Sequence, residues 1–295
     1  MNLQAQISAR QTRPRHSRLS CVDRAGLVDL LILRGQVLSR IADYERAERT
    51  AEYLVSDEPD EGLAFLARAR TRATFHRFTQ AVADLATADR LGADPTEVDT
   101  ERAAVHQALG HYDQAQDLLR EVVRRRADFQ SLGALAGLYA QRADIARAER
   151  LFADSRSCYR GVSPFPLALL DFHRGRMWQR RHDISRACLW FDSALRRLPD
   201  LAPAQGCYAR TEAALGETSS AIARLQRLVT STDDPDHSAQ LAILLHETGR
   251  ADEAQQWSER AAARYDQLCA RHPEAFTDHA VRFRLAMGDL ADRSH

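Results

Sequence analysis

The residues that could hold a metal ion are histidines and acids, and their spacing completes no recognisable site. His246 and Glu247 begin like the helix of a zinc protease, but the second histidine of that motif is replaced by Arg250. His173 and His182 lie nine residues apart, with no further ligand near them in the sequence. Scattered histidines of this kind are expected on helices, so the spacing predicts no metal site.

Amino-acid usage excludes several catalytic chemistries. The sequence has no lysine, so all 41 basic residues are arginine. A Schiff-base lysine and a P-loop lysine are therefore impossible, and neither G-x-G-x-x-G nor G-x-S-x-G occurs. The cysteines are odd in number and form no C-x-x-C pair, which predicts reduced thiols: Cys21, Cys158, Cys188, Cys207 and Cys269. We expect a protein with no enzyme activity and no cofactor.

Charge and hydropathy narrow the class of partner. The formal net charge is zero and the mean hydropathy is −0.45. No apolar run approaches the roughly 18 residues that a membrane helix needs. A neutral chain is also a poor candidate for general binding to nucleic acid or a membrane surface. We therefore expect a cytoplasmic protein, and the absence of lysine favours a GC-rich bacterial genome.

Residues 1–27 have a different composition from the rest of the chain. The part before Asp23 contains four arginines and no acid, and the whole segment lacks the apolar stretch of a secretory signal. A disordered arm is the main prediction, and a mitochondrial transit peptide or weak, nonspecific contact with nucleic acid are the alternatives. The four arginines are Arg10, Arg13, Arg15 and Arg18.

A ten-residue segment recurs seven times, as in "GHYDQAQDLL" from Gly110. Successive copies start 34, 34, 33, 39, 34 and 33 residues apart, at Ala42, His76, Gly110, Ala143, His182, Gly216 and Gly249. The sixth residue of every copy is alanine: Ala47, Ala81, Ala115, Ala148, Ala187, Ala221 and Ala254. Twelve residues before each alanine lies another small residue: Gly35, Ala69, Ala103, Ala136, Gly175, Ala209 and Ala242.

This pattern predicts pairs of helices that cross closely. Two backbones can approach closely only where the side chains are small. This explains why each unit has a small residue at two positions. Gly110 ends the first helix, and Tyr112 then fills the groove between the two helices. Leu119 continues the apolar stripe one turn after Ala115. No unit buries its own apolar face, so stability must come from the stacking of neighbours.

The arrangement resembles the tetratricopeptide repeat, a 34-residue helix–turn–helix unit. The resemblance implies an all-α right-handed solenoid of about seven repeats over residues 28–271, a capping helix over 272–290 and a tail over 291–295. The repeats would start near residues 28, 62, 96, 129, 168, 202 and 235. The chain departs from the family where leucine is usual before the first small residue, because four repeats have arginine there: Arg34, Arg68, Arg102 and Arg174.

The one longer interval in the pattern, of 39 residues, has a local explanation. Residues 158–166 contain Gly161, Pro164 and Pro166, which interrupt the rhythm between repeats 4 and 5. This insertion is either a neutral loop or a hinge that contacts a partner. The second helix of repeat 7 is expected to be long, over about 252–271.

The resemblance implies that first helices line an inner groove where partner peptides bind. The site after the first small residue holds Gln36, Arg70, Ala104, Gly137, Arg176, Arg210, Ile243 and, on the cap, Arg282. Apolar side chains one turn earlier include Ile32, Leu66 and Phe172. We expect a groove that combines arginines with apolar pockets and suits an acidic segment with bulky apolar residues. The alternative is that these arginines lie on an ordinary solvated face.

The function predicted on this basis is a non-enzymatic scaffold that binds a protein or peptide. A ligand-responsive regulator and an accessory subunit that docks an enzyme are the alternatives, and fold alone does not separate them. One binding mode is disfavoured. The family's carboxylate clamp for chaperone termini uses lysine and asparagine, and this sequence has no lysine and only Asn2.

Overall fold

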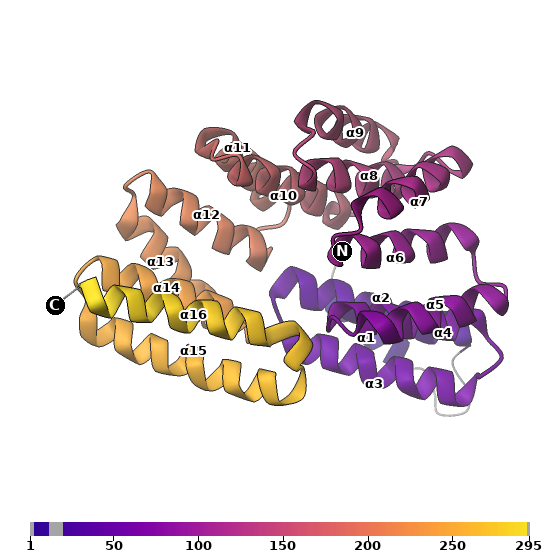
Figure 1. Cartoon of the computed structure of the whole chain (residues 1–295), viewed down its shortest axis with the longest axis horizontal. Coiled ribbons are helices and arrows are strands. Elements are labelled where there is room, and N and C mark those ends of the chain that lie inside the picture. Colours follow the sequence, from indigo (N-terminus) through magenta and orange to yellow (C-terminus); the bar gives the residue numbers. More distant parts are fainter. Residues whose placement is uncertain (1–2, 12–19, 294–295) are drawn as a thin grey trace.

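The computed structural model describes residues 3–11 and 20–293, and within them the chain is a ring of helices with no strand (Figure 1). The helices are α1 (Leu3–Gln11), α2 (Cys21–Leu38), α3 (Ile41–Asp57), α4 (Gly62–Thr74), α5 (Phe78–Arg90), α6 (Pro95–Ala108), α7 (Tyr112–Arg125), α8 (Phe129–Gln141), α9 (Ile145–Cys158), α10 (Pro164–Arg180), α11 (Ile184–Arg197), α12 (Ala202–Ala214), α13 (Thr218–Leu228), α14 (Pro235–Glu247), α15 (Ala251–Arg271) and α16 (Pro273–Arg293).

The helices from α2 to α15 form seven antiparallel pairs, and α16 follows as a single helix (Figure 1). The predicted all-α solenoid of seven repeats with a C-terminal helix is confirmed. Four repeats begin at the expected residue, because α4, α8, α12 and α14 start at 62, 129, 202 and 235. The first repeat differs, since α2 already begins at Cys21, and α10 begins at Pro164.

The two ends of the chain are more ordered than the sequence suggests. Within the expected disordered arm, residues 3–11 form α1 and residues 21–27 begin α2, so the prediction is wrong there. The physical reason is burial: Leu3 and Ile7 are 8% and 0% exposed in the core. Of the four arginines, Arg10 lies against Gly26 of α2, whereas residues 13, 15 and 18 fall outside the described residues. The predicted tail is also wrong as far as Arg293, because α16 continues to that residue.

The small residues lie where paired helices touch. All fourteen are buried. A Cβ atom placed on Gly35 would be 2.6 Å from the ring of Tyr44, and one placed on Gly175 would be 2.6 Å from the ring of Phe191. Such distances are too short for any side chain, so an aromatic ring occupies the space that glycine leaves.

The first helix of every repeat ends on a residue with positive φ. Gly110, Gly216 and Gly249 do so without strain, whereas the other repeats use residues with a side chain. In repeat 1 this residue is Ser39, so the turn comes earlier than the pattern predicts and α3 starts at Ile41. The remaining three are His76, Ala143 and His182.

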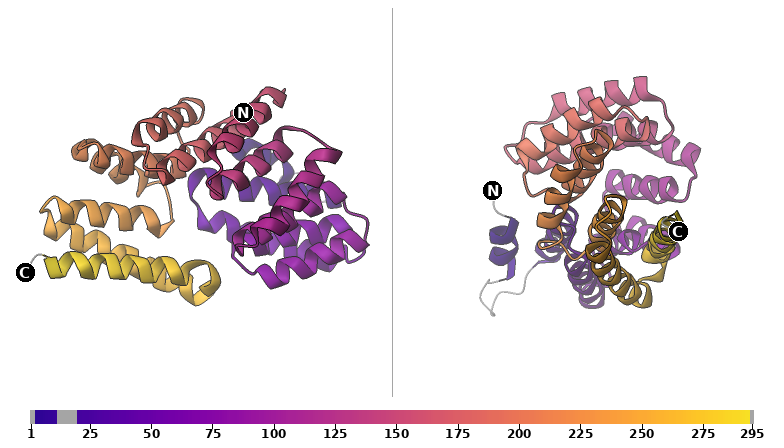
Figure 2. Two further views of the ribbon diagram at one scale, coloured as in Figure 1. Left: turned by 45° about the horizontal axis from the view of Figure 1, so that its top comes forward. Right: turned by 90° about the vertical axis from the view of Figure 1, so that its left-hand side faces the viewer.

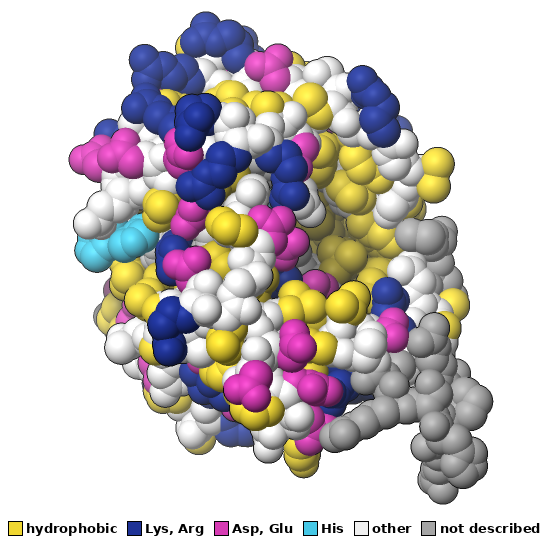
Figure 3. Space-filling model, turned by 90° about the vertical axis from the view of Figure 1, so that its right-hand side faces the viewer, with side chains coloured by type: hydrophobic (Ala, Val, Ile, Leu, Met, Phe, Trp, Pro, Cys, Tyr) yellow, Lys and Arg dark blue, Asp and Glu magenta, His cyan; other side chains and the backbone are white. Residues whose placement is uncertain are grey.

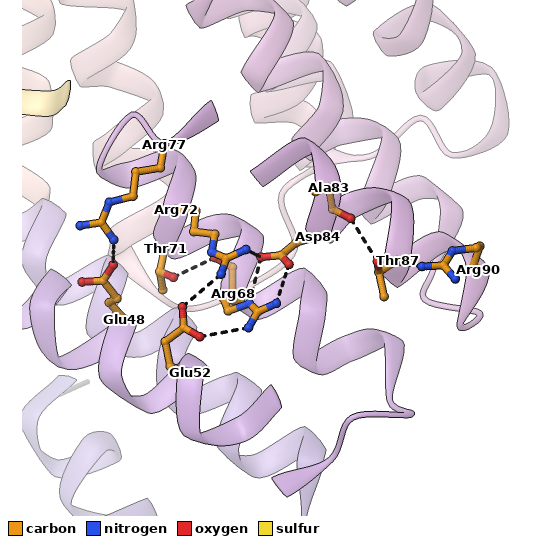
Figure 4. A network of polar contacts seen from close by, with 10 residues as sticks. All are labelled: Glu48, Glu52, Arg68, Thr71, Arg72, Arg77, Ala83, Asp84, Thr87 and Arg90. Atoms are coloured by element: carbon orange, nitrogen blue, oxygen red, sulfur yellow. Dashed lines mark hydrogen bonds and ion pairs between the residues drawn. The ribbon is translucent and has the colours of Figure 1, made fainter. Parts of the chain in front are cut away.

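The arginines that replace the family's leucine bind carboxylates on neighbouring helices. Arg68 on α4 contacts Asp84 on α5 at 2.7 Å and Glu52 on α3 at 3.0 Å. Figure 4 shows Arg72 joining the same two carboxylates, so three helices are linked by one network. The other three form ion pairs too: Arg34 with Asp43, Arg102 with Asp89 and Asp99, and Arg174 with Glu149.

The solenoid makes one turn and its two ends meet. Figures 1 and 2 show α15 and α16 beside α3, although these helices are far apart in the sequence. The imidazole of His272 stacks on Phe75 with ring centroids 3.8 Å apart. Asp233 accepts hydrogen bonds from the backbone N–H groups of Ile41 and Ala42, so it caps α3 from the other end of the chain. These contacts close the ring.

The insertion between repeats 4 and 5 contributes to this closure. The extra residues start α10 at Pro164, and Phe165 joins a core cluster with Leu3 and Val37 from the N-terminal helices. Tyr159 fixes the linker by donating a hydrogen bond to the carbonyl of Ser163 at 2.6 Å. The insertion therefore packs the middle of the chain against its beginning.

Candidate functional site

The inner wall of the ring contains four adjoining cavities, and the largest is lined by four of the predicted groove residues. This cavity of about 570 Å³, the cationic cavity, is lined by Phe172 and Arg176 of α10, Arg210 of α12 and Arg282 of α16. Ile243 of α14 lines it as well. Residues that follow the first small residue in repeats 5, 6 and 7 and in the capping helix thus meet in one hollow.

Two further cavities continue from it along the wall. The middle cavity, about 370 Å³, is lined by Arg176, Arg180 and His173 of α10 and by the small residues Ala104 and Gly137. Arg176 belongs to both cavities, so the two adjoin there.

The apolar cavity, about 460 Å³, shares His173 with the middle cavity. It is lined by Leu33 of α2, Phe129 of α8, and Phe165 and Leu169 of α10. An apolar hollow and a cationic one therefore follow each other within a short distance on the inner wall.

Arg70 occupies the fourth cavity and has a different environment. Its guanidinium contacts Asp29 at 3.1 Å, Glu97 at 2.8 Å and Glu101 at 2.8 Å. These acids line the same hollow of about 490 Å³, the acidic cavity, so Arg70 is fully engaged by the protein itself. Figure 3, viewed from the side of α4–α7, shows arginines and carboxylates interspersed over much of this face. The hydrogen-bonding capacity of Arg70 is used within the fold.

The other two predicted groove residues do not line any of these four cavities. Leu66 is 1% exposed and packs in the core of repeats 2 and 3. Ile32 is half-buried and packs against the core of α2–α4. The repeat register places both residues on the first helices of their repeats. Their side chains, however, pack between helices and do not line these cavities.

The arginines of the cationic and middle cavities have no acidic partner. Within the described residues, no carboxylate lies within 4.0 Å of the guanidinium of Arg176, Arg180 or Arg210. Arg210 instead donates a hydrogen bond to the sulfur of Cys207 at 3.0 Å. Arg176 lies over the ring of Phe172, 5.8 Å from its centroid. This concentration of positive charge is not neutralised by the protein.

Electrostatic effects of this cluster appear on its neighbours. Arg176 and His173 reach solvent in the channel yet are surrounded by protein. Enclosure, followed by the charges of Arg180 and Arg210, lowers the pKa of Arg176. Enclosure and the charges of Arg176 and Arg180 lower the pKa of His173 to about 4. His173 is therefore neutral at physiological pH.

Two carboxylates, Asp234 and Asp236, also line the cationic cavity, and each has other partners. Asp236 accepts a hydrogen bond from the hydroxyl of Tyr265 and contacts Nδ1 of His279 at 3.2 Å. Asp234 caps α14 by accepting from the N–H of Asp236 at 3.0 Å. Burial, followed by the charge of Asp236, raises the pKa of Asp234 to about 7. The hydrogen-bond partners of both carboxylates are therefore groups other than Arg176 and Arg210.

His237 is a site residue that the sequence analysis missed. It lines the cationic cavity, is 4% exposed, and neither ring nitrogen has a hydrogen-bond partner. The amide oxygen of Gln240 one turn later is also buried without a partner. Buried polar groups are almost always hydrogen-bonded, so these three atoms mark His237 and Gln240 as candidate binding groups. No motif in the sequence signals this, because the environment of His237 depends on α10, α12 and α16.

A signal for the unpaired arginines was present in the repeat register. The carboxylates that hold Arg70 come from the second residue of the preceding repeat and the second and sixth residues of the following one. Around Arg176 the corresponding residues are Gln130, Pro203 and Cys207, none of which is acidic. Comparison of neighbouring repeats could therefore have separated Arg70 from Arg176.

Other kinds of site find no support in the residues described. In 3–11 and 20–293, no cluster of three or more His, Cys, Asp or Glu side chains could hold a metal ion. None of the sixteen helices is long and apolar enough to cross a membrane.

Comparison with known proteins identifies the fold. No protein-family model matches the chain, and neither does any curated protein sequence. Among solved structures, the chain is similar to IFIT1 with m7Gppp-AAAA (TM-score 0.70, 15% identity, covering 99% of this chain and 68% of that one). It also resembles a chain of the APC/C hetero-tetramer Cut9–Hcn1 (TM-score 0.56, 16% identity, 82% of this chain).

The chain spans only 46% of that Cut9–Hcn1 chain. A third similar structure is a tetratricopeptide repeat protein from Parabacteroides merdae, with a TM-score of 0.51, 16% identity, and coverage of 88% and 98%. Identity at this level establishes the fold, and the repeat register and helix pairing agree with it. The chain therefore has the fold of tetratricopeptide repeat proteins.

Proposed function

We propose that the protein is a non-catalytic scaffold that binds a partner's peptide segment on the inner wall of the ring. The segment would carry acidic groups for Arg176 and Arg210 and a bulky apolar side chain for the apolar cavity. One observation carries the proposal: unpaired arginines adjoin an apolar hollow lined by Leu33, Phe165 and Leu169.

In this proposal, the cationic cavity and the apolar cavity contribute differently to binding. Guanidinium groups bind carboxylates through paired hydrogen bonds, which gives orientation and specificity. Ion pairs open to solvent contribute only about 0–1 kcal/mol each. An apolar side chain that enters the apolar cavity would therefore supply much of the affinity, at about 1.5–3 kcal/mol for full burial.

The remaining predicted groove residues have other roles in this proposal. Arg282 lies at the C-terminal edge of the cationic cavity and extends the positive surface. Arg70 is engaged by three acids and belongs to the structural part of the wall. The proposed binding region accordingly excludes Arg70 and is formed by repeats 4–7 and the capping helix, with Leu33 of repeat 1 and Ala104 of repeat 3.

The proposal can be tested by selecting twelve-residue peptides from a random phage library on the purified chain. We expect enrichment of sequences that combine Asp or Glu with an aromatic or large aliphatic residue. The double variant Arg176→Glu, Arg210→Glu should lose this enrichment, with its fold checked by circular dichroism.

The matched control reverses two charges elsewhere. Arg49 of α3 and Arg150 of α9 are exposed and, within the described residues, form no ion pair. The variant Arg49→Glu, Arg150→Glu should select the same peptides as the original chain. Equal enrichment by the Arg176→Glu, Arg210→Glu variant and by this control variant would contradict the proposal.

A further inference from the structure

Three like charges lie together where α10 and α12 face the channel. Arg176 and Arg180 are one turn apart on α10, and the charge of Arg210 on α12 acts on Arg176. Arg34, Arg68, Arg102 and Arg174, in contrast, all bind carboxylates, as does Arg70. Gathering three cations without a counter-charge is unfavourable, and a bound anion would remove that cost.

The imidazole of His237 supplies an independent sign of a missing ligand. Its two ring nitrogens are buried and unpartnered in the same cavity that Arg176 and Arg210 line. The ring is held against Gly206, where an added Cβ would lie 3.0 Å from Nδ1 and Cε1. Burial and the charge of Arg210 lower the pKa of His237 to about 4, against the opposing effect of Asp236. The neutral ring offers one N–H donor to an acceptor in the cavity.

The number and kind of donors suit a phosphoryl group better than a single carboxylate. A phosphate monoester carries about −1.5 to −2 charges at pH 7 and has three terminal oxygens. A carboxylate carries one charge and two oxygens, so it would leave most of the cluster's charge without compensation. Guanidinium groups match both the charge and the geometry of phosphate.

The surrounding wall favours a single phosphate on a peptide over a polynucleotide. The middle cavity shares Thr100 with the acidic cavity, where Asp29, Glu97 and Glu101 would repel a second phosphate. In the other direction lies the apolar cavity. His173 is its one titratable lining residue, and it is neutral at physiological pH. A chain of phosphates would meet acids or an apolar surface on either side.

We propose that Arg176, Arg210 and the imidazole of His237 bind one phosphoryl group on a serine or threonine of a partner peptide, with Arg180 adding positive charge from the adjoining middle cavity. The peptide's neighbouring apolar residue then enters the cavity lined by Leu33, Phe165 and Leu169. This inference rests on the proposed peptide-binding function and names the group that the cluster recognises.

The test compares three peptide libraries on the full chain by fluorescence polarisation. All are eight-residue peptides with random flanks, and the fixed central residue is phosphoserine, serine or glutamate. We expect the phosphoserine library to bind at least about tenfold more tightly than the serine library, a difference of about 1.4 kcal/mol. The glutamate library should fall between them.

Variants assign the preference to the cluster. Arg176→Gln with Arg210→Gln should abolish the tenfold preference, whereas the control Arg49→Gln with Arg150→Gln should retain it. His237→Phe should reduce the preference, and His237→Gln, which keeps a donor, should retain most of it. Circular dichroism on each variant verifies folding, and the arginine pair remains decisive if His237→Phe does not fold.

Other outcomes separate this inference from the proposed function. Equal affinity for phosphoserine and glutamate libraries would overturn the phosphoryl site and leave acidic-peptide binding in place. Failure of all three libraries, together with binding of a 5′-phosphorylated ten-nucleotide RNA, would overturn both. Thermal stabilisation by inorganic phosphate alone, with no preference among the peptides, would overturn the peptide part of the inference.

Discussion

Arg70 and Arg176 occupy the same position in repeats 2 and 5, but their surroundings differ completely. Arg70 is surrounded by three carboxylates, whereas Arg176 lies over a phenylalanine ring and experiences the charges of Arg180 and Arg210. The repeat decides that both side chains face the channel. The identity of residues in the adjacent repeats decides whether the charge is neutralised. In this molecule, the arginine in one part of the inner wall links neighbouring helices, whereas the corresponding arginine in another part has no ion pair within the described residues.

The largest effect is expected from removing the structural arginine. Arg70→Gln leaves Asp29, Glu97 and Glu101 together without a cation. We expect the free energy of unfolding to fall by about 2 kcal/mol, a value between those for exposed and buried ion pairs. Urea unfolding at pH 8 measures it. The loss should shrink toward pH 4, because protonation relieves the repulsion between the carboxylates. No loss at pH 8 would show that Arg70 is not structural.

Breaking the ring closure tests whether the two parts of the wall belong to one rigid channel. Asp233→Ala removes the cap of α3 and the ion pair with Arg264. We therefore expect the free energy of unfolding to fall by about 1–2 kcal/mol. Small-angle scattering should show a larger radius of gyration. Asp252→Ala, which removes an exposed carboxylate on α15, serves as the control. An unchanged radius would mean that other contacts suffice for closure.

The charge of the cluster can be followed through His173. Arg176→Gln removes one of the two cations that depress its pKa, so the pKa should rise from about 4 toward 6.5. Part of the depression should remain, since enclosure is the larger cause. NMR titration measures the value, with His173→Asn assigning the signal. A pKa that does not move would indicate that Arg176 is screened from His173.

The smallest effect is the one that we expect Arg176→Gln to have on the free energy of unfolding. Because Arg176 has like charges and no acid near it, Arg176→Gln should be neutral or stabilising by about 0.5 kcal/mol. Screening predicts that this gain disappears as salt rises from about 0.05 M to 0.5 M. Arg49→Gln provides the baseline for an exposed arginine. A clear destabilisation would remove the contrast with Arg70.

Much of this architecture follows from the spacing of small residues. Ala47 and Ala115 predicted where helices cross, and the turn residues Gly110 and Gly216 predicted where they end. The first repeat was harder, because the turn there uses Ser39 and its next helix is capped by Asp233 from the other end of the chain. The prediction of a disordered arm was wrong for a similar reason: Leu3 belongs to a core cluster that includes Phe165 and Leu201, more than 150 residues away in the sequence.

The candidate site was only partly predictable. Periodicity placed Phe172, Arg176, Arg210 and Arg282 on inner helices, and they do line one cavity. Leu66 had the same periodic support but turned out to be core. His237 gave no signal at all, because burial of its ring depends on packing with helices from other repeats.

The sequence by itself determined the local structure: a 34-residue period of small and apolar residues requires helix pairs that stack, since each unit leaves an apolar face uncovered. Tertiary structure alone decided that the stack closes into a ring, and which arginines remain without a carboxylate. Charge neutralisation depends on distances between residues of different repeats. Those distances are set by superhelical curvature and by the contacts of Phe75, Asp233 and His272 across the closure, and no single repeat encodes them.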